Sequence, residues 1–132
     1  LESMRSGGVK IGIVTFRRRE TVEKILSRMN VSHLFDVIIG SGDVPEEKPS
    51  PQPFLAASER MNVAPSECLV IGDEPADITG GNRAGVRTIG VFGGASNREM
   101  LRKAGASMVV ESLEELANIV ETSYRTCGIT YL

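Results

Sequence analysis

The stretch ECLVIGDEPADI, residues 67–78, joins an unbroken apolar segment to a cluster of carboxylates. Residues 68–71 are apolar enough to predict a buried strand. Asp73, Glu74 and Asp77 follow this segment at once. Like charges that crowd together raise one another's pKa unless a cation or hydrogen bonds relieve them. The acids therefore either cap and charge the start of the next helix or form part of a metal site.

Similar apolar segments recur along the chain, and helical patterns lie between them. Apolar segments without polar alternation are typical of strands buried on both faces of a parallel sheet. The predicted strands are 9–15, 36–40, 68–72, 87–92 and 107–110. The sequence therefore predicts an α/β fold, a doubly wound, Rossmann-like parallel sheet of about five strands, in a single domain, 1–132. Residues 122–132 are a tail whose structure the pattern leaves open.

The composition excludes several classes of protein. Fifteen basic and 17 acidic residues give a formal charge of −2, so no sequence-wide attraction to nucleic acid or to an anionic membrane is expected. No apolar segment approaches the ~20 residues that a membrane-spanning helix needs. The two cysteines do not make a disulfide framework, which is typical of a protein of the reducing cytoplasm.

Polar side chains follow three of the predicted strands. Thr15 ends the first, Lys48 lies in the loop after the second, and Asp73 ends the third, with Asp77 close behind. Ligands bind beyond the carboxyl ends of the strands in such sheets, so these side chains should converge on one edge. A hydroxyl, an ammonium and two carboxylates suit a phosphate that is bound together with a hard divalent cation such as Mg²⁺.

These motifs, in this order, resemble those of the haloacid dehalogenase-like hydrolases, especially the phosphoglycolate-phosphatase-like branch. Thr15 matches the Ser or Thr that ends a strand, and KPSP (48–51) matches Lys-Pro-x-Pro. GDEPAD (72–77) matches Gly-Asp-x-x-x-Asp. Phe16 departs from the family, which often has Asn at this position. The likeness extends over residues 1–121, so the resemblance implies a haloacid dehalogenase-like core.

The resemblance also implies a function and a role for each residue. The family hydrolyses small phosphorylated metabolites through an aspartyl-phosphate, with the help of Mg²⁺. Thr15 and the amide after it would bind the phosphoryl group, and Lys48 would stabilise the nucleophile and the developing charge. Asp73 would ligate Mg²⁺. Asp77 would ligate the ion, hold its water or orient Lys48.

One motif of the family is absent from this sequence. Asp-x-Asp, which supplies the nucleophile and the general acid on the central first strand, occurs nowhere in the 132 residues. We therefore expect a truncated domain without nucleophile or cap, inactive alone and at best a weak binder of Mg²⁺. The strands at 9–15 and 68–72 would then lack a neighbour, and each buried unpaired backbone group costs about 1–3 kcal/mol.

Three arrangements would satisfy these two strands. They could pair with each other, or another chain could fill the gap, as a homodimer or by strand exchange. The β-prone segment TCGITYL (126–132) could also add as a strand, although a frayed tail is the commoner state of such a segment.

Less specific interpretations stand beside these. Thr15 alone would be an ordinary β-branched strand residue, and Lys48 an exposed loop charge. A pseudo-enzyme that serves as a binding or oligomerisation module is the alternative function, so whether this chain is an enzyme stays open. A phospho-receiver domain is rejected, because in that class the acids come before the Thr and the Lys.

Overall fold

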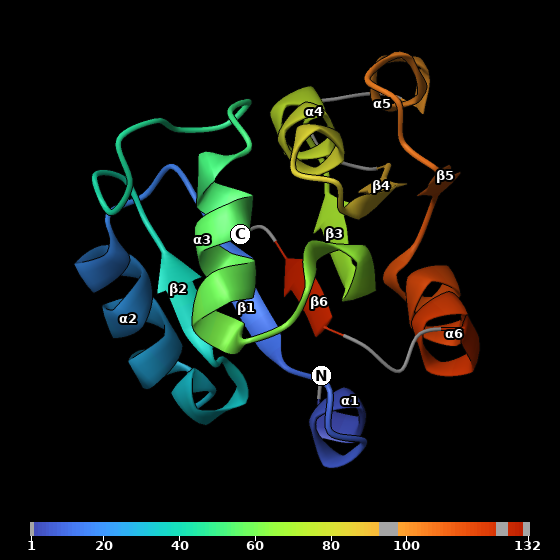
Figure 1. Ribbon diagram of the computed structural model, residues 1–132. Coiled ribbons are helices and arrows are strands. Elements are labelled where there is room, and N and C mark those ends of the chain that lie inside the picture. The colour runs from blue at the N-terminus through green and yellow to red at the C-terminus, as the bar shows by residue number, and fades with distance from the viewer. Residues whose placement is uncertain (1, 93–97, 124–126, 131–132) are drawn as a thin grey trace.

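The computed structural model describes the backbone of residues 2–92, 98–123 and 127–130, and Figure 1 shows it as alternating strands and helices. The strands are β1 (Ile11–Val14), β2 (Val37–Ile39), β3 (Cys68–Gly72), β4 (Arg87–Val91), β5 (Met108–Val110) and β6 (Cys127–Thr130). The helices are α1 (Glu2–Ser6), α2 (Arg19–Arg28), α3 (Gln52–Met61), α4 (Pro75–Arg83), α5 (Arg98–Lys103) and α6 (Leu113–Ser123), with short 3₁₀ turns at Ser32–Leu34 and Pro65–Glu67.

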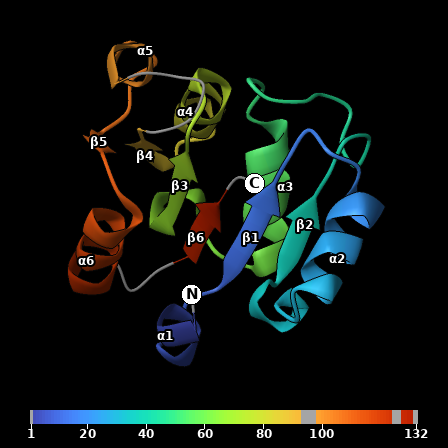
Figure 2. The ribbon, with the colours of Figure 1, turned by 180° about the vertical axis from the view of Figure 1, so that it is seen from behind.

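All six strands form one parallel sheet in the order β2-β1-β6-β3-β4-β5. Figure 2 shows the same sheet from behind, with β6 between β1 and β3. The prediction of a doubly wound α/β sheet is confirmed. In the described part of the chain, none of the helices combines the length and the apolarity that a membrane crossing requires.

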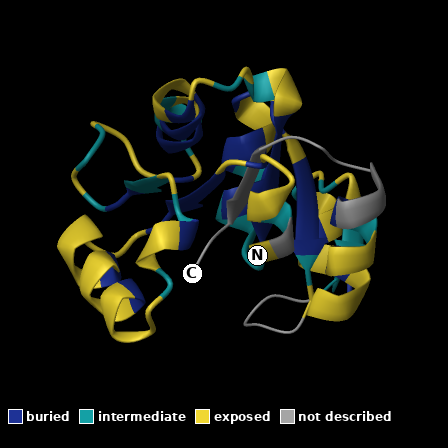
Figure 3. Cartoon of the chain, turned by 90° about the horizontal axis from the view of Figure 1, so that it is seen from below, coloured by how far each residue is buried: buried dark blue, intermediate teal, exposed yellow. Residues whose placement is uncertain are grey.

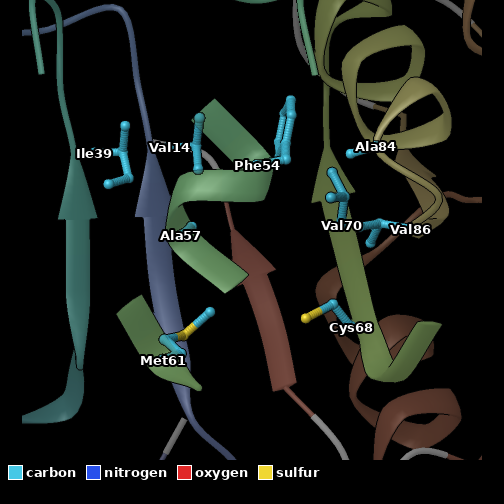
Figure 4. Close-up of a cluster of buried hydrophobic side chains, with 9 residues drawn as sticks. All are labelled: Val14, Ile39, Phe54, Ala57, Met61, Cys68, Val70, Ala84 and Val86. Atoms are coloured by element: carbon cyan, nitrogen blue, oxygen red, sulfur yellow. The ribbon is translucent and has the colours of Figure 1, made fainter. Parts of the chain in front are cut away.

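Strand β3 shows why its sequence is apolar without alternation. Cys68 and Val70 belong to a buried cluster that includes side chains of α3 and of the segment between α4 and β4, and Figure 4 shows this layer. Leu69 and Ile71 belong to a second cluster, which includes Leu116 and other side chains of α6. Successive residues of a strand face opposite sides of its sheet, so β3 is covered on both faces. All residues of β1 and of β3 are buried, and buried strands are drawn dark blue in Figure 3.

The number of strands differs from the prediction. About five were expected, with the middle of the sheet incomplete, and the structure has a sixth strand in that place. Residues 128–130 pair in parallel with 11–13 of β1, and residues 127–130 pair with 68–71 of β3. The expectation of a frayed tail is therefore wrong for 127–130, whereas 124–126 and 131–132 lie outside the described residues.

The physical reason for this sixth strand is the hydrogen bonding of its neighbours. The edges of β1 and β3 that face each other carry backbone N–H and C=O groups deep in the sheet. A buried backbone group without a partner is expensive, and nearly all such groups in folded proteins are paired. A β-prone segment that reaches the gap satisfies both edges at once, so tertiary context decides its conformation.

Candidate phosphate site at the carboxyl edge of the sheet

Three loops meet where the parallel strands end. Thr15 follows β1 directly, Lys48 lies between β2 and α3, and Asp73 follows β3 directly. Asp77 lies in the first turn of α4. Asp73 acts electrostatically on Lys48, and the Lys48 ammonium bonds the residue that precedes Thr15. The loops thus place the predicted residues at one edge of the sheet.

The centre of this edge is a buried ion pair. Lys48 Nζ lies 2.6 Å from Asp77 Oδ1, and the two side chains are 2% and 1% exposed. The same ammonium also donates to the carbonyl oxygen of Val14, at 3.3 Å. The Lys48–Pro49 peptide is cis. Lys48 is therefore a buried group that ties the loop after β2 to both β1 and α4, and not an exposed loop charge.

Burial shifts the pKa of both residues of the pair. It lowers the pKa of Lys48, while the negative charge of Asp77 acts in the opposite direction. It raises the pKa of Asp77, while the positive charge of Lys48 opposes that shift. Two charges removed from water are tolerated when they are paired and hydrogen-bonded, so each residue is needed to keep the other ionised.

Phe16 completes the surroundings of the lysine. Its ring centroid lies 4.5 Å from Lys48 Nζ, a cation–π distance, and the residue is 39% exposed. Sequence reasoning noted this residue only as a departure from the family. The signal that could have indicated this contact is a large aromatic residue directly after Thr15, where the family often has a short polar residue.

Thr15 is held firmly at the end of β1. Its backbone N–H donates to the carbonyl oxygen of Ile39, at 3.0 Å, and its Oγ1 accepts from the backbone N–H of Arg17, at 3.1 Å. Only 5% of the residue is exposed. The hydroxyl is therefore held in a fixed position at the end of β1.

Asp73 and Asp77 differ in what their oxygens contact. Asp77 Oδ1 contacts Lys48, and its Oδ2 accepts from the backbone N–H of Glu74, at 3.3 Å. Asp73 Oδ1 is buried and has no hydrogen-bond partner in the described structure. An orphaned carboxylate oxygen is a suitable ligand for a hard cation, so Asp73 fits a metal site. Both carboxylate oxygens of Asp77 already have partners, so its contacts favour a role in orienting Lys48 over a role in binding the ion.

The metal site is incomplete as a protein cage. Among the residues that the structure describes, no three His, Cys, Asp or Glu side chains gather to hold an ion. Mg²⁺ commonly binds through one or two carboxylates, with waters and substrate phosphate oxygens as its other ligands. Asp73 could therefore supply one ligand to Mg²⁺, and the ion's other ligands would have to be waters, substrate oxygens or groups outside the described residues.

Gly72 allows α4 to start close to the strand. A Cβ at this position would lie 2.3 Å from the Cβ of Asp77 and 2.7 Å from its Oδ2. Side-chain atoms do not approach so closely, so any larger residue would displace Asp77 from Lys48. The glycine that ends the apolar segment thus sets the position of the carboxylate.

Comparison with known proteins points to one family. The haloacid dehalogenase-like hydrolase profile matches residues 1–91. The pyrophosphatase PpaX of Bacillus mycoides is 34% identical over 120 residues, which cover 91% of this chain and 56% of the relative. The chain spans about half the length of the curated relatives it matches.

Solved structures agree with this match. A hydrolase from Pseudomonas syringae superposes with a TM-score of 0.82 at 28% identity, covering 93% of this chain and 56% of that one. CbbY from Rhodobacter sphaeroides, solved in complex with phosphate, gives a TM-score of 0.78 at 25% identity. That superposition covers 87% of this chain and 52% of CbbY.

Proposed function

Because the chain belongs to the haloacid dehalogenase-like hydrolase family, we propose that it forms the phosphoryl-binding part of a Mg²⁺-dependent phosphatase site. The observation that carries this proposal is the buried Lys48–Asp77 pair beside Thr15 and the orphaned oxygen of Asp73. An ammonium and a hydroxyl that are already fixed in place bind a phosphoryl group without the entropic cost of ordering them.

Each residue has a distinct part in this proposal. Thr15 and the amide of Phe16 bind phosphoryl oxygens, and Lys48 offsets the negative charge that develops during transfer. The Asp77 carboxylate keeps the Lys48 ammonium charged and holds it in position. Asp73 would hold Mg²⁺, which neutralises phosphate charge when it is bound.

The substrate class follows from the same site. A small phosphorylated metabolite would place its phosphate between Thr15 and Lys48, and inorganic pyrophosphate is a reasonable first probe because curated relatives are pyrophosphatases. No Asp-x-Asp occurs in the sequence, so the carboxylate that forms the aspartyl-phosphate would come from outside these 132 residues. We expect the chain alone to bind phosphate and not to turn it over.

Phosphate binding tests the proposal most directly. Titration of the chain with inorganic phosphate and Mg²⁺, followed by calorimetry, is expected to show weak binding that Thr15→Val reduces at least several-fold. Thr21→Val, on the exposed side of α2, is the matched control and should bind as the parent does. Equal phosphate affinity in the parent and in Thr15→Val would overturn the proposal.

Turnover tests the origin of the nucleophile. The chain is incubated with p-nitrophenyl phosphate or pyrophosphate in the presence of Mg²⁺, and release of product is followed. No turnover is expected. Robust turnover that Asp73→Asn abolishes would require a nucleophile within this chain.

A non-catalytic module is the second candidate, and strand β6 favours it. The sheet is continuous because β6 pairs with both β1 and β3, so the fold does not need another chain at its centre. A binding or oligomerising module of this kind should unfold at the same denaturant concentration with and without Mg²⁺ and phosphate. A shift in the midpoint that depends on Asp73 would instead support the phosphatase site.

A further inference from the structure

Phe16 lies directly beside the residues of the proposed phosphate site. It follows Thr15, and its ring centroid is 4.5 Å from Lys48 Nζ. The Lys48 side chain is only 2% exposed, whereas Phe16 is 39% exposed. The ammonium lies over the ring, so one ring face is turned to a buried cation, and the opposite face is the side that solvent or a ligand can reach.

The backbone on the carboxyl side of Phe16 is fixed by hydrogen bonds. The Arg17 N–H donates to Thr15 Oγ1 at 3.1 Å, and the Arg17 carbonyl oxygen accepts from the backbone N–H of Ser41 at 2.8 Å. The loop also packs closely on Gly40, where a Cβ would lie 2.4 Å from the backbone nitrogen of the first residue of α2. A loop that is already ordered loses little conformational freedom when a ligand packs against its side chain.

We propose that Phe16 is a specificity-determining residue that favours phosphate monoesters with an aromatic ester group. This inference rests on the proposed function, because it requires a phosphoryl group bound by Thr15 and by the amide of Phe16. The ring and that amide belong to the same residue, so the ester group of a bound phosphate lies within reach of the ring. An aromatic group gains by covering exposed aromatic surface, whereas a short ester group covers little of it.

Two phosphate esters that differ only in the ester group test this preference. Phenyl phosphate and methyl phosphate offer the same phosphate to Thr15, Lys48 and Mg²⁺, so the ratio of their affinities reports on the ester group. NMR titration of the whole chain in Mg²⁺ is expected to show phenyl phosphate bound about three- to tenfold more tightly than methyl phosphate. Phe16→Asn should bring this ratio close to one. The ratio is taken within one protein, so any change in how the variant binds the phosphate itself cancels.

Phe92 provides the matched control. It is also 39% exposed and follows β4, which β3 and β6 separate from β1 in the sheet. Phe92→Asn should therefore keep the affinity ratio of the parent. A second measurement needs no variant: nuclear Overhauser effects are expected between the phenyl protons of the bound ligand and the ring protons of Phe16 in the parent.

The outcomes separate the role of Phe16 from the proposed function. Equal affinities of the parent for the two esters would overturn the role of Phe16, and so would an affinity ratio that Phe16→Asn leaves unchanged. If both esters bind equally and Thr15→Val weakens both, the phosphate site stands and only the role of Phe16 is wrong. If neither ester binds, the proposed function fails, and the role of Phe16 fails with it.

Discussion

Lys48 Nζ lies 2.6 Å from Asp77 Oδ1, and the two side chains are almost fully buried although they are 29 positions apart. The contact joins the loop after β2 to the first turn of α4. The same ammonium donates to Val14, so it also joins both elements to the end of β1. The Lys48 ammonium therefore holds the end of β1, the loop after β2 and the first turn of α4 together, and these three elements carry the proposed phosphate site.

Removal of one partner of this pair should be strongly destabilising. Lys48→Met leaves the Asp77 carboxylate buried and unpaired, and Asp77→Leu does the same to the ammonium. Each single variant is expected to lose about 3–5 kcal/mol in the free energy of unfolding, measured by urea denaturation. The double variant, with two apolar side chains of similar size, should recover most of that loss. A double variant that loses the sum of both single losses would contradict the pairing.

The Lys48–Asp77 pair should also change how the free energy of unfolding depends on pH. The folded-state pKa of Asp77 is raised above 3.8, so its contribution to stability falls as pH rises from 3.8 through the folded value. The folded-state pKa of Lys48 is lowered below 10.5, so its contribution rises as pH climbs from the folded value to 10.5. Relative to the double variant, the parent should be least stable between these windows, as urea denaturation across pH will show. A parent that gains most over the double variant near neutral pH would contradict this sign.

The position of Asp77 should depend on the glycine that ends β3. Gly72→Ala would place its Cβ 2.3 Å from that of Asp77, and neither atom is the end of a flexible side chain. The helix start must move, and the ion pair with Lys48 should break, so a loss of about 2–4 kcal/mol is expected in urea denaturation. Gly8→Ala is the control, because no atom lies within 4 Å of a Cβ there and only its φ of +85° opposes the change. Equal losses in both variants would show that the contact with Asp77 does not matter.

Much of the fold could be predicted from the sequence because β3 is apolar on both faces and is followed by Gly72 and Asp73. Unbroken apolar segments indicate a covered parallel sheet, and parallel strands bring their carboxyl ends together. Thr15 and Lys48 could therefore be assigned to the same edge as Asp73 before any coordinates were known.

The remainder depended on contacts that no local pattern encodes. The strand at 127–130 forms because β1 and β3 both offer unpaired backbone groups, and its own sequence predicts a frayed tail equally well. A lysine beside prolines is typical of an exposed loop, so the near-complete burial of Lys48 was not expected. The contact of Phe16 with that lysine likewise arises only when the two loops meet.

Asp73 should respond to Mg²⁺ more than any other acid of the site. Its Oδ1 is buried without a hydrogen-bond partner in the described structure, so a bound cation would relieve a desolvated oxygen. Addition of Mg²⁺ to the metal-free chain is expected to raise the melting temperature by a few degrees at most, since one protein ligand binds the ion weakly. Asp73→Asn should abolish this shift, whereas Asp36→Asn, which precedes β2 at the opposite edge of the sheet, should retain it. An identical shift in the parent and in Asp73→Asn would place the ion elsewhere.

Strand β6 should be necessary for a stable fold. A chain that ends at Ser123 lacks 127–130, so the facing edges of β1 and β3 lose their hydrogen-bond partners, and each buried group left unpaired costs about 1–3 kcal/mol. Because the whole domain is stabilised by only ~5–15 kcal/mol, several such losses should abolish cooperative unfolding or drive association through the bare edges. Circular dichroism in urea and size-exclusion chromatography will show either result. A chain that ends at Thr130 keeps β6 and is the matched control. A monomer ending at Ser123 with the urea midpoint of that control would mean that β1 and β3 do not depend on the strand between them.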